Sequence, residues 1–416
     1  MDRILLVEDT HIFGKFICTK IAQSHNIPID WALSMAEAQT YIERYEGQYI
    51  LALLDLGLPD APRGEIVPYI LDQNIPAAVF TGSYNKERKE QLLAAGIIDY
   101  IMKDSPISLD YVITFIDRII KNRQIKAMVI GGDKSEQKQI MAVLNLMQIQ
   151  SVSLNDERDA LALLNQQQNF GLILIAGGMI TGTPFTTLTT IRGKKKFAHI
   201  PIITIENSDQ IDGSRFLKYG ASDFLRAPIN TTDLQIRVQN SLRLYDQMQM
   251  LEFTANHDYL TSVLNRRAFF SKAKSLFALR DRKSVTLTLA MFDIDHFKNI
   301  NDSYGHDVGD IAIKTLAQHL KSHSRDTDLV ARFGGEEFCI LYANMDADAA
   351  PQIFETLRES VAAIKIPYKD GEDISFSISA GVVLAGDDDI NTMIKKADEA
   401  LYKSKTTGRN KVTFTA

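Results

Sequence analysis

Cysteine is scarce in this sequence, and long apolar runs and an excess of basic charge are missing. Cys18 and Cys339 are its only cysteines, and each lies in an apolar stretch far from the other, which predicts buried thiols in a reducing compartment and no disulfide framework. The opening MDRILLVEDT is too short in apolar residues for a signal peptide, and no later segment approaches the roughly 20 apolar residues of a membrane span. The net charge of -6 gives no field for capturing nucleic acid. We therefore expect a cytoplasmic protein with neither nucleic-acid nor membrane partners.

The chain is long, and part of it is repeated. Its 416 residues predict three domains. Apolar runs that end in acidic residues, at 3–7 and 49–54, alternate with helical patterns and favour a parallel doubly wound sheet. The segments NIPAAVFTG and AAGIIDYIMK return later as HIPIITIEN and KYGASDFLRA, so a second copy of the same domain begins near Lys126. We expect domains at 1–123, 124–245 and 246–416.

A long amphipathic helix follows the second copy. Thr232 is a plausible N-cap, and the pattern is that of the last helix of the second domain. Apolar residues then recur at spacings of three or four at Leu234, Val238, Leu242, Tyr245, Met248 and Leu251. Because the pattern passes Leu244 without glycine or proline, it predicts a stalk that pairs with a second copy of the chain.

Acidic residues follow two strands of the first predicted sheet. Glu8 and Asp9 follow one strand and Asp55 follows another, and the carboxyl ends of parallel strands share one edge of the sheet. Hard oxygen ligands of this kind suit Mg²⁺, which neutralises an incoming phosphoryl group while a carboxylate attacks it. Asp55 is the candidate nucleophile, and its product would be an acyl phosphate.

Three further residues belong to the same predicted edge. Thr81 ends the next strand and can donate to a phosphoryl oxygen, and Lys103 ends the last strand and supplies positive charge. Tyr100 is placed where an aromatic side chain could move in response to Thr81. Residues 1–123 thus resemble receiver domains of two-component response regulators, with Asp104 where that family usually has proline. The resemblance implies phosphorylation of Asp55 by a sensor histidine kinase or phosphotransfer protein, and a switch role for Tyr100.

The second copy lacks these groups. Aligned on the first, its acid pair becomes Gly132 and Asp133, and the phosphoacceptor, threonine and lysine become Ala176, Glu206 and Ala227. Alanine cannot form an acyl phosphate, and one carboxylate is a poor Mg²⁺ site. We interpret the second copy as a degenerate receiver that acts as an adaptor.

A third mixed pattern begins at His257. Strands are expected at 285–292, 338–342 and 375–383, and helices near 308–322, 350–364 and 390–404. Asp293 lies at the end of the first of these apolar strands, and Glu336 and Glu337 follow the glycine pair of RFGGEEF, in a turn between two strands. A Gly-Gly turn allows close approach of a ligand to backbone, and clustered carboxylates suggest Mg²⁺ on a triphosphate, although GGEEF alone also fits a solvated hairpin.

Five segments decide between these interpretations. DYLTSVLNRR, FDIDHFKNINDSYGHDVGD, RFGGEEF, SFSISAGV and ADEALYKSKTTGRN occur in this order, and over residues 250–416 the chain resembles GGDEF-family diguanylate cyclases. The implied fold is an α/β domain with a palm-like mixed sheet, after two flavodoxin-like receivers. The implied reaction joins two GTP molecules into cyclic di-GMP and releases two pyrophosphates.

The resemblance also assigns roles within the third domain. It implies that Mg²⁺ is bound by Asp293, the Ile294 carbonyl oxygen and Glu336, and that Glu336 or Glu337 helps to deprotonate the attacking 3'-hydroxyl. Guanine contacts fall to Asn301 and Asp310, with His306 as a ribose or base contact or a structural residue of a helix start. Contacts to phosphates fall to Lys298, Lys405 and Arg409.

A product-inhibition site is implied as well. Arg325 and Asp328 form RDTD six residues before the glycine pair, where they would bind cyclic di-GMP as feedback inhibitor. The supporting arginine of some members aligns with Thr356, with Arg358 nearby, so we expect weak inhibition.

Each cyclase domain holds one GTP, so two must face each other and the active form is expected to be a homodimer, controlled by phosphorylation. A non-catalytic GTP or cyclic di-GMP sensor, a cyclase for another purine dinucleotide and a DNA-binding response regulator are the alternatives. The intact GGEEF, the presence of Asp310 and the absence of a basic recognition helix argue against them in turn.

Overall fold

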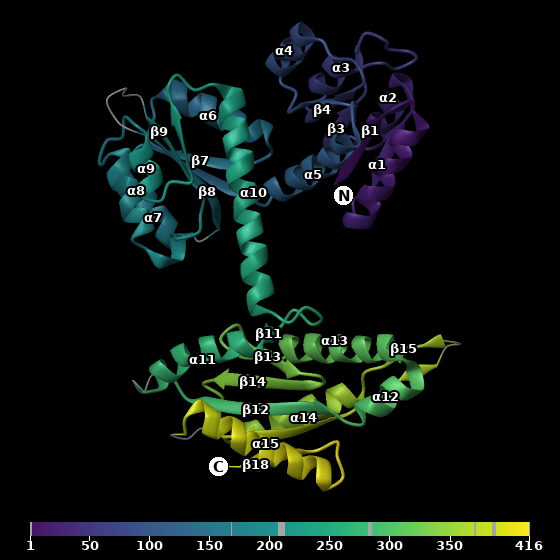
Figure 1. Cartoon of the computed structure of the whole chain (residues 1–416), viewed down its shortest axis with the longest axis vertical. Helices are drawn as coiled ribbons and strands as arrows, with labels where there is room; N and C mark the ends of the chain where they lie inside the picture. The colour runs from purple at the N-terminus through teal and green to yellow at the C-terminus, as the bar shows by residue number, and fades with distance from the viewer. Residues whose placement is uncertain are drawn as a thin grey trace. The chain divides into compact units, whose positions relative to one another are not determined.

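The structure is a computed structural model that describes residues 2–167, 169–206, 213–281, 285–369, 372–384 and 388–415. The chain divides into two compact units, Met1–Asp246 and Gln247–Ala416 (Figure 1). Cys18 and Cys339 are both free thiols, but only Cys339 is buried, so the expectation for Cys18 is corrected to a half-buried position. Within the described ranges, helices that combine the length and apolar character needed to cross a membrane do not occur.

The first unit begins with a five-stranded parallel sheet in the order β2-β1-β3-β4-β5. All six residues of β3 are buried, because helices cover both faces of the sheet. The strands are β1 (Arg3–Val7), β2 (Ile29–Ala32), β3 (Tyr49–Leu54), β4 (Ala77–Thr81) and β5 (Tyr100–Met102). The helices are α1 (His11–Ser24), α2 (Met35–Arg44), α3 (Ile66–Asp72), α4 (Lys86–Ala95) and α5 (Pro106–Asn122).

A second parallel sheet in the same unit has the same order, β7-β6-β8-β9-β10 when read from its second strand. Two doubly wound, flavodoxin-like sheets are therefore confirmed. The strands are β6 (Lys126–Ile130), β7 (Gln150–Leu154), β8 (Phe170–Ala176), β9 (Ile202–Glu206) and β10 (Asp223–Arg226). The helices are α6 (Lys134–Leu146), α7 (Glu157–Gln166), α8 (Pro184–Arg192), the 3-10 helix η1 (Lys195–Phe197), α9 (Ser214–Lys218) and α10 (Thr231–Asn256).

Helix α10 begins earlier than the sequence predicts. Asn230 Oδ1 accepts from the Asp233 amide at 2.9 Å, so Asn230 caps the helix and Thr232 lies inside it. Leu234, Val238 and Leu242 are buried in the core of the second sheet. Beyond them Leu244, Met248 and Leu251 are exposed, as a stalk requires.

Helix α10 also contacts the half of the first unit that contains the first sheet. Gln235 donates to the Ile98 carbonyl at 2.7 Å, just before β5. Asp246 accepts from the Arg118 guanidinium of α5 at 2.6 Å, and Lys121 Nζ lies 3.7 Å from the same carboxylate. The last helix of the second copy is therefore tied to the last helix of the first.

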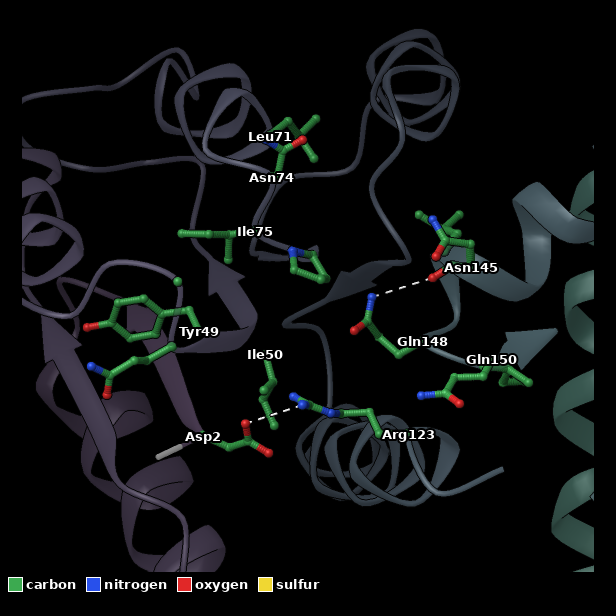
Figure 2. A pocket seen from close by; sticks show the side chains of 15 residues that line it. Asp2, Tyr49, Ile50, Leu71, Asn74, Ile75, Arg123, Asn145, Gln148 and Gln150 are labelled. Carbon is green, nitrogen blue, oxygen red and sulfur yellow. Dashed lines mark hydrogen bonds and ion pairs between the residues drawn. The ribbon is translucent and has the colours of Figure 1, made fainter. Parts of the chain in front are cut away.

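A cleft of about 640 Å³ lies where the two halves of the first unit meet (Figure 2). Its polar wall includes Gln148, Gln150 and the ion pair of Arg123 with Asp2 at 3.2 Å. The cleft lies at the amino ends of β3, β4 and β7. Because doubly wound sheets bind ligands at the carboxyl ends of their strands, the cleft is a junction between halves and not the expected site.

The second unit contains a mixed six-stranded sheet in the order β11-β13-β14-β12-β17-β18. The central strand β12 is antiparallel to both neighbours, β14 and β17. The strands are β11 (Leu264–Asn265), β12 (Leu287–Ile294), β13 (Leu329–Gly334), β14 (Glu337–Ala343), β17 (Ile378–Val383) and β18 (Val412–Thr415), with a separate pair β15 (Ile366–Pro367) and β16 (Asp373–Ile374). The helices are α11 (Arg266–Asp281), α12 (Phe297–Tyr304), α13 (His306–Ser322), α14 (Ala350–Ala362) and α15 (Ile390–Thr406).

Alternate residues of β12 face two different cores. Ala290, Phe292 and Ile294 pack in the core that includes α13 and α14, while Leu289 and Met291 pack in the core that includes α11 and α15. By this period of two, Asp293 lies on the side of α15. Asp293 was predicted at the end of an apolar strand, and it is the last residue but one of β12, opposite Glu337 on β14 and Ser379 on β17.

Candidate active site and phosphoacceptor site

The carboxyl edge of the first sheet brings together the predicted acidic residues. Oxygens of Glu8, Asp9 and Asp55 lie within 4.8 Å of one another, and the described part of the chain contains no other such group of three. Glu8 and Asp55 are buried and Asp9 is exposed. Strand register explains the meeting, because Val7 pairs with Leu54 and each carboxylate follows its strand. This set of hard oxygen ligands fits a divalent cation.

Lys103 lies between two of these carboxylates. Its ammonium nitrogen is 2.6 Å from Glu8 Oε2 and 2.6 Å from Asp55 Oδ2, and its side chain is 6% exposed. Burial raises the pKa of Glu8, and Lys103 opposes that shift. The Leu56 amide donates to Asp55 Oδ1 at 2.7 Å, which fixes the orientation of the Asp55 carboxylate.

Thr81 and Tyr100 are connected through one loop. The Ser83 amide donates to Thr81 Oγ1 at 3.4 Å, and the buried Tyr100 hydroxyl donates to the Ser83 carbonyl at 2.8 Å. The Lys103 amide donates to the Thr81 carbonyl at 2.8 Å. The five predicted supporting residues of Asp55 thus lie at one edge of the sheet, and a change at Thr81 has a short route to Tyr100.

The equivalent edge of the second sheet requires a correction. Ile130 pairs with Ile175 as Val7 pairs with Leu54, so the residues that follow β6 at the Glu8 and Asp9 positions are Gly131 and Gly132, not Gly132 and Asp133. Asp133 instead corresponds to the helix-capping position of Thr10, and it caps α6 by accepting from two backbone amides. Neither position of the acid pair therefore carries a carboxylate.

The remaining positions of the second edge are as predicted. Ala176 ends β8, Glu206 ends β9, and the Ala227 amide donates to the Glu206 carbonyl as Lys103 does to Thr81. The Gly132 amide donates to the Gly177 carbonyl at 2.5 Å. A Cβ on Gly131 would collide with the Ala176 carbonyl oxygen, so backbone fills the space that the first copy uses for side chains.

Asp293 is the buried carboxylate of the second unit. It is 4% exposed, and its Oδ2 lies 2.6 Å from Lys405 Nζ on α15. Burial raises the pKa of Asp293 to about 6, Lys405 lowers it, and the charges of Glu336 and Glu337 raise it further. The sequence-predicted carboxylates are thus electrostatically coupled, and a cation from α15 reaches the same strand end.

The GGEEF turn is held by residues that sequence reasoning missed. Gly335 has φ +52°, and its carbonyl accepts from Arg332 Nε at 2.9 Å and Nη2 at 2.7 Å. Arg332 Nη1 in turn donates to Asp258 at 2.9 Å. Both residues lie inside the segments RFGGEEF and DYLTSVLNRR, but their pairing across the sequence left no local signal.

The donor set around Asp293 fits Mg²⁺. Magnesium is commonly bound in proteins through one or two carboxylates together with substrate phosphates and water. Asp293 and Glu336 offer the carboxylates, and the Ile294 carbonyl oxygen lies at the end of the same strand. The pKa of Asp293 is raised mainly by burial and further by the charges of Glu336 and Glu337, and a divalent cation would favour the charged form of this carboxylate.

The predicted guanine contacts lie on α12 and α13. Asn301 Oδ1 is buried and has no hydrogen-bond partner among the described residues. A Cβ on Gly309 would collide with that oxygen, so glycine allows α13 to approach Asn301. His306 begins α13 and Asp310 lies one turn later, both exposed, and Lys298 is exposed in the first turn of α12. An orphaned buried acceptor requires a donor from a ligand or water.

Arg409 lies in a short loop after α15. Its side chain is exposed, and its amide donates to the Ser404 carbonyl at 3.0 Å. Gly408 precedes it with φ +122°. Lys405 and Arg409 thus come from one helix end, and the loop after that end is anchored by the buried residue Asp295, which sequence reasoning also missed.

Arg325 and Asp328 lie in one turn before β13. The Asp328 carboxylate is buried and accepts from the Arg325 amide at 2.8 Å and from the Ala343 amide at 3.1 Å. The Arg325 residue is exposed. Arg358, the nearby arginine, pairs with Glu355 at a side-chain exposure of 14% and reaches Asn410.

Comparison with known proteins assigns the second unit to a protein family. Residues 255–411 match the family described as diguanylate cyclase, GGDEF domain. A solved response regulator/GGDEF domain protein of a two-component system is 31% identical, with a TM-score of 0.53, and the alignment covers 59% of this chain and 100% of that protein. The chain belongs to the GGDEF family. A second solved protein of the same description matches at 32% identity and the same TM-score of 0.53.

Curated GGDEF relatives match over a smaller share of their own length. Diguanylate cyclase A of Treponema denticola is 41% identical over 171 residues, which cover 40% of this chain and 46% of the relative. The response regulator PleD of Caulobacter vibrioides is 31% identical over 244 residues, which cover 56% of this chain and 53% of the relative. The chain thus spans about half the length of these relatives. The PleD alignment is longer than the second unit, so it includes part of the first.

Proposed function

We propose that this protein is a diguanylate cyclase that condenses two GTP molecules into cyclic di-GMP and two pyrophosphates. The observation that carries the proposal is the coupling of buried Asp293 to the GGEEF carboxylates and to Lys405, at the strand end of a GGDEF domain. GTP and its product are cytoplasmic nucleotides, so we propose that the protein acts in the cytoplasm.

Asp293, the Ile294 carbonyl oxygen and Glu336 would hold Mg²⁺. The bound ion would supply charge neutralisation at the phosphates and make the α-phosphorus more electrophilic. Glu337, opposite Asp293 in the sheet, or Glu336 takes the proton of the attacking 3'-hydroxyl. The oxygen of that hydroxyl then bonds to the α-phosphorus of the second GTP, and pyrophosphate leaves.

The substrate is oriented by groups at both ends. The unpartnered Asn301 Oδ1 accepts from guanine, whose edge carries adjacent N–H donors, and Asp310 accepts from the same edge. His306 lies between them in the sequence and contacts the ribose or base. Lys298, Lys405 and Arg409 bind the phosphates, where guanidinium and ammonium groups offset the triphosphate charge.

Catalysis requires two copies of the chain. Because each GGDEF domain binds one GTP, both bonds of the cyclic product form only when two domains face each other. Leu244, Met248 and Leu251 follow spacings of four and three on the exposed end of α10, and this pattern supports pairing of two stalks. The active species in this proposal is a homodimer.

Residues 1–123 form the receiver that controls this dimer. A sensor histidine kinase or phosphotransfer protein phosphorylates Asp55, and Glu8, Asp9 and Asp55 would hold a Mg²⁺ ion that would neutralise the incoming phosphoryl group. Thr81 would then bind the phosphoryl oxygen, and its loop contact to Ser83 would shift the bond that Tyr100 makes. The Arg118–Asp246 pair offers a route from α5 to the stalk helix.

Residues 124–245 act as an adaptor, and residues 246–416 are the cyclase with its stalk. The absence of carboxylates at the Gly131 and Gly132 positions supports the adaptor role. Arg325 and Asp328 form the site of product inhibition by cyclic di-GMP. The buried Asp328 holds the Arg325 backbone, and the exposed arginine side chain makes the contact.

GTP turnover by the purified full chain with Mg²⁺ tests the proposal, with dinucleotide product and oligomeric state followed together. We expect cyclic di-GMP to form, to increase with beryllofluoride and dimer formation, and to disappear in Glu336→Ala. Asp302→Asn, an exposed acidic residue of α12, is the matched control. Nucleotide binding without product would contradict the cyclase and favour a sensor.

A further inference from the structure

Asp295 is a buried acidic residue that the reaction scheme above does not use. It follows β12 and is 5% exposed. Its Oδ1 accepts from the Ser379 hydroxyl at 2.6 Å, and its Oδ2 accepts from the Ser377 hydroxyl at 2.7 Å and the Asn410 amide at 2.8 Å. Three donors thus bind the two oxygens of the carboxylate. One of them belongs to the loop that carries Arg409.

That loop has a backbone conformation that side chains rarely adopt. Gly408, Arg409 and Asn410 have φ values of +122°, +62° and +45°. A non-glycine residue in this region costs on the order of 1 kcal/mol or more, and such conformations persist only where surrounding contacts fix them. The Asn410 amide is bound by Asp295, and the Asn410 side chain accepts from Arg358 Nη1 at 2.8 Å.

Two carboxylates of one strand end therefore bind both ends of one segment. Asp293 pairs with Lys405 in the last turn of α15, and Asp295 binds the Asn410 amide five residues later. Asp295 lies one residue beyond β12 and accepts from the Ser379 hydroxyl, and Ser379 pairs with Asp293, so both carboxylates lie beside the same residue of β17. Arg409 lies between these two anchors in the sequence, so its Cα position is set by β12.

We propose that Asp295 is a positioning residue for the triphosphate of GTP, acting through Arg409. The inference rests on the proposed cyclase function, in which Arg409 binds a phosphate. Asp295 makes no contact with substrate in this proposal. Asp295 keeps the strained 408–410 loop in one conformation before GTP binds. Binding of GTP to Arg409 therefore does not have to include the entropy cost of ordering that loop.

The test is binding of 3'-deoxy-GTP, which lacks the attacking hydroxyl, to the full chain with Mg²⁺. We expect Asp295→Asn and Arg409→Ala each to weaken binding about tenfold, the scale of one hydrogen bond to a charged group. If Asp295 acts through Arg409, the double variant binds within about twofold of Arg409→Ala alone. Exchange of the Asn410 amide hydrogen should accelerate in Asp295→Asn, a readout independent of activity.

Two further variants keep the test decisive. Arg358→Met loosens the same loop from the side of Asn410 and should weaken binding about threefold without touching Asp295. Asp302→Asn should change nothing. Losses that add in the double variant, or unchanged binding in Asp295→Asn while Arg409→Ala loses affinity, overturn this inference alone. Failure of the wild-type chain to bind 3'-deoxy-GTP overturns the proposed function and the inference with it.

Discussion

The two doubly wound sheets of the first unit share one strand order but differ at the edge where ligands bind. In the first sheet this edge collects buried Glu8 and Asp55 around Lys103. In the second, Gly131 and Ala176 occupy the corresponding carboxylate positions and backbone closes the space. The fold therefore does not depend on the charged edge, and a site can be lost while its scaffold remains.

The charged edge is also costly for the first sheet. Burial of an ion pair often contributes little net stability, because desolvation offsets the attraction between the charges. Glu8 is 1% exposed, and burial raises its pKa while Lys103 opposes that shift. The second copy shows that this scaffold is complete without such groups. Retention of them in the first copy supports a chemical role.

The largest expected difference is in phosphoryl uptake. Incubation of the full chain with acetyl phosphate and Mg²⁺ should add one phosphoryl group, and Asp55→Asn should abolish the addition, because an amide is not the required nucleophile. Intact mass measures the result. Asp133→Asn is the matched control and should leave uptake unchanged. A phosphoryl group that persists in Asp55→Asn would mean that the second copy, or another residue, accepts it.

The next effect concerns Lys103. Lys103→Met removes the shared cation and leaves Glu8 and Asp55 buried without it, which should lower the free energy of unfolding by about 3 kcal/mol. Trp31, the chain's single tryptophan, donates to the Glu8 carbonyl at 2.8 Å, so its fluorescence reports unfolding of this half specifically. Ala227→Met in the second sheet should leave that transition unchanged. Equal stability of Lys103→Met and wild type would contradict a stabilising role of Lys103 between the two buried carboxylates.

Gly131 tests the corresponding edge of the second sheet. Gly131→Ala introduces a Cβ against the Ala176 carbonyl oxygen at φ +78°, so both strain and overpacking should reduce stability, by about 2 kcal/mol. Gly178 has a similar φ of +72°, but a Cβ there would lie 4.0 Å from the Gly132 carbonyl carbon, an ordinary van der Waals contact, and Gly178→Ala should cost only about 1 kcal/mol. Calorimetry of both variants separates the two contributions. A cost no greater for Gly131→Ala would show that the edge can open.

The sequence predicted repeated elements well because buried strands carry a clear apolar pattern. Thr81 and Glu206, which end β4 and β9, occupy equivalent register positions, as expected. The acid pair was misplaced by one residue because the offset between copies changes along the chain. It is 123 from Arg3 to Lys126 (126 minus 3), at the starts of β1 and β6, but 125 from Ala77 to Ile202 (202 minus 77), at the starts of β4 and β9. Glycines carry no side-chain pattern that would fix the register.

In the second unit, helices near 308–322, 350–364 and 390–404 were predicted within a few residues of α13, α14 and α15. The residues missed there, Asp258, Arg332 and Asp295, have partners far away in the sequence. Asp295 binds an amide 115 residues later. Local patterns predict elements because they act within one turn or strand, whereas contacts between distant segments exist only after the sheet has formed.

The smallest expected effect on stability concerns the last helix of each copy. Helix α5 ends at Asn122, whereas α10 continues to Asn256 and carries Asp246 to the Arg118 guanidinium of α5. Burial lowers the pKa of Arg118, and its Nε and Nη2 have no partner among the described residues, so loss of the Asp246 charge leaves a buried cation uncompensated. Asp246→Asn should lower the free energy of unfolding, measured by Trp31 fluorescence, by about 1 kcal/mol.

Lys121 gives the matched control for this helix contact, because its nitrogen lies 3.7 Å from the same carboxylate while its side chain is 57% exposed. Lys121→Ala should change stability by less than about 0.5 kcal/mol, as exposed ion pairs do. If α10 transmits the state of the first sheet, Asp246→Asn should also reduce the activation of GTP turnover by beryllofluoride, whereas Lys121→Ala should not. Full activation in Asp246→Asn would show that the stalk receives its signal by another contact, and the bond from Gln235 to the Ile98 carbonyl, also between α10 and the first sheet, is one candidate.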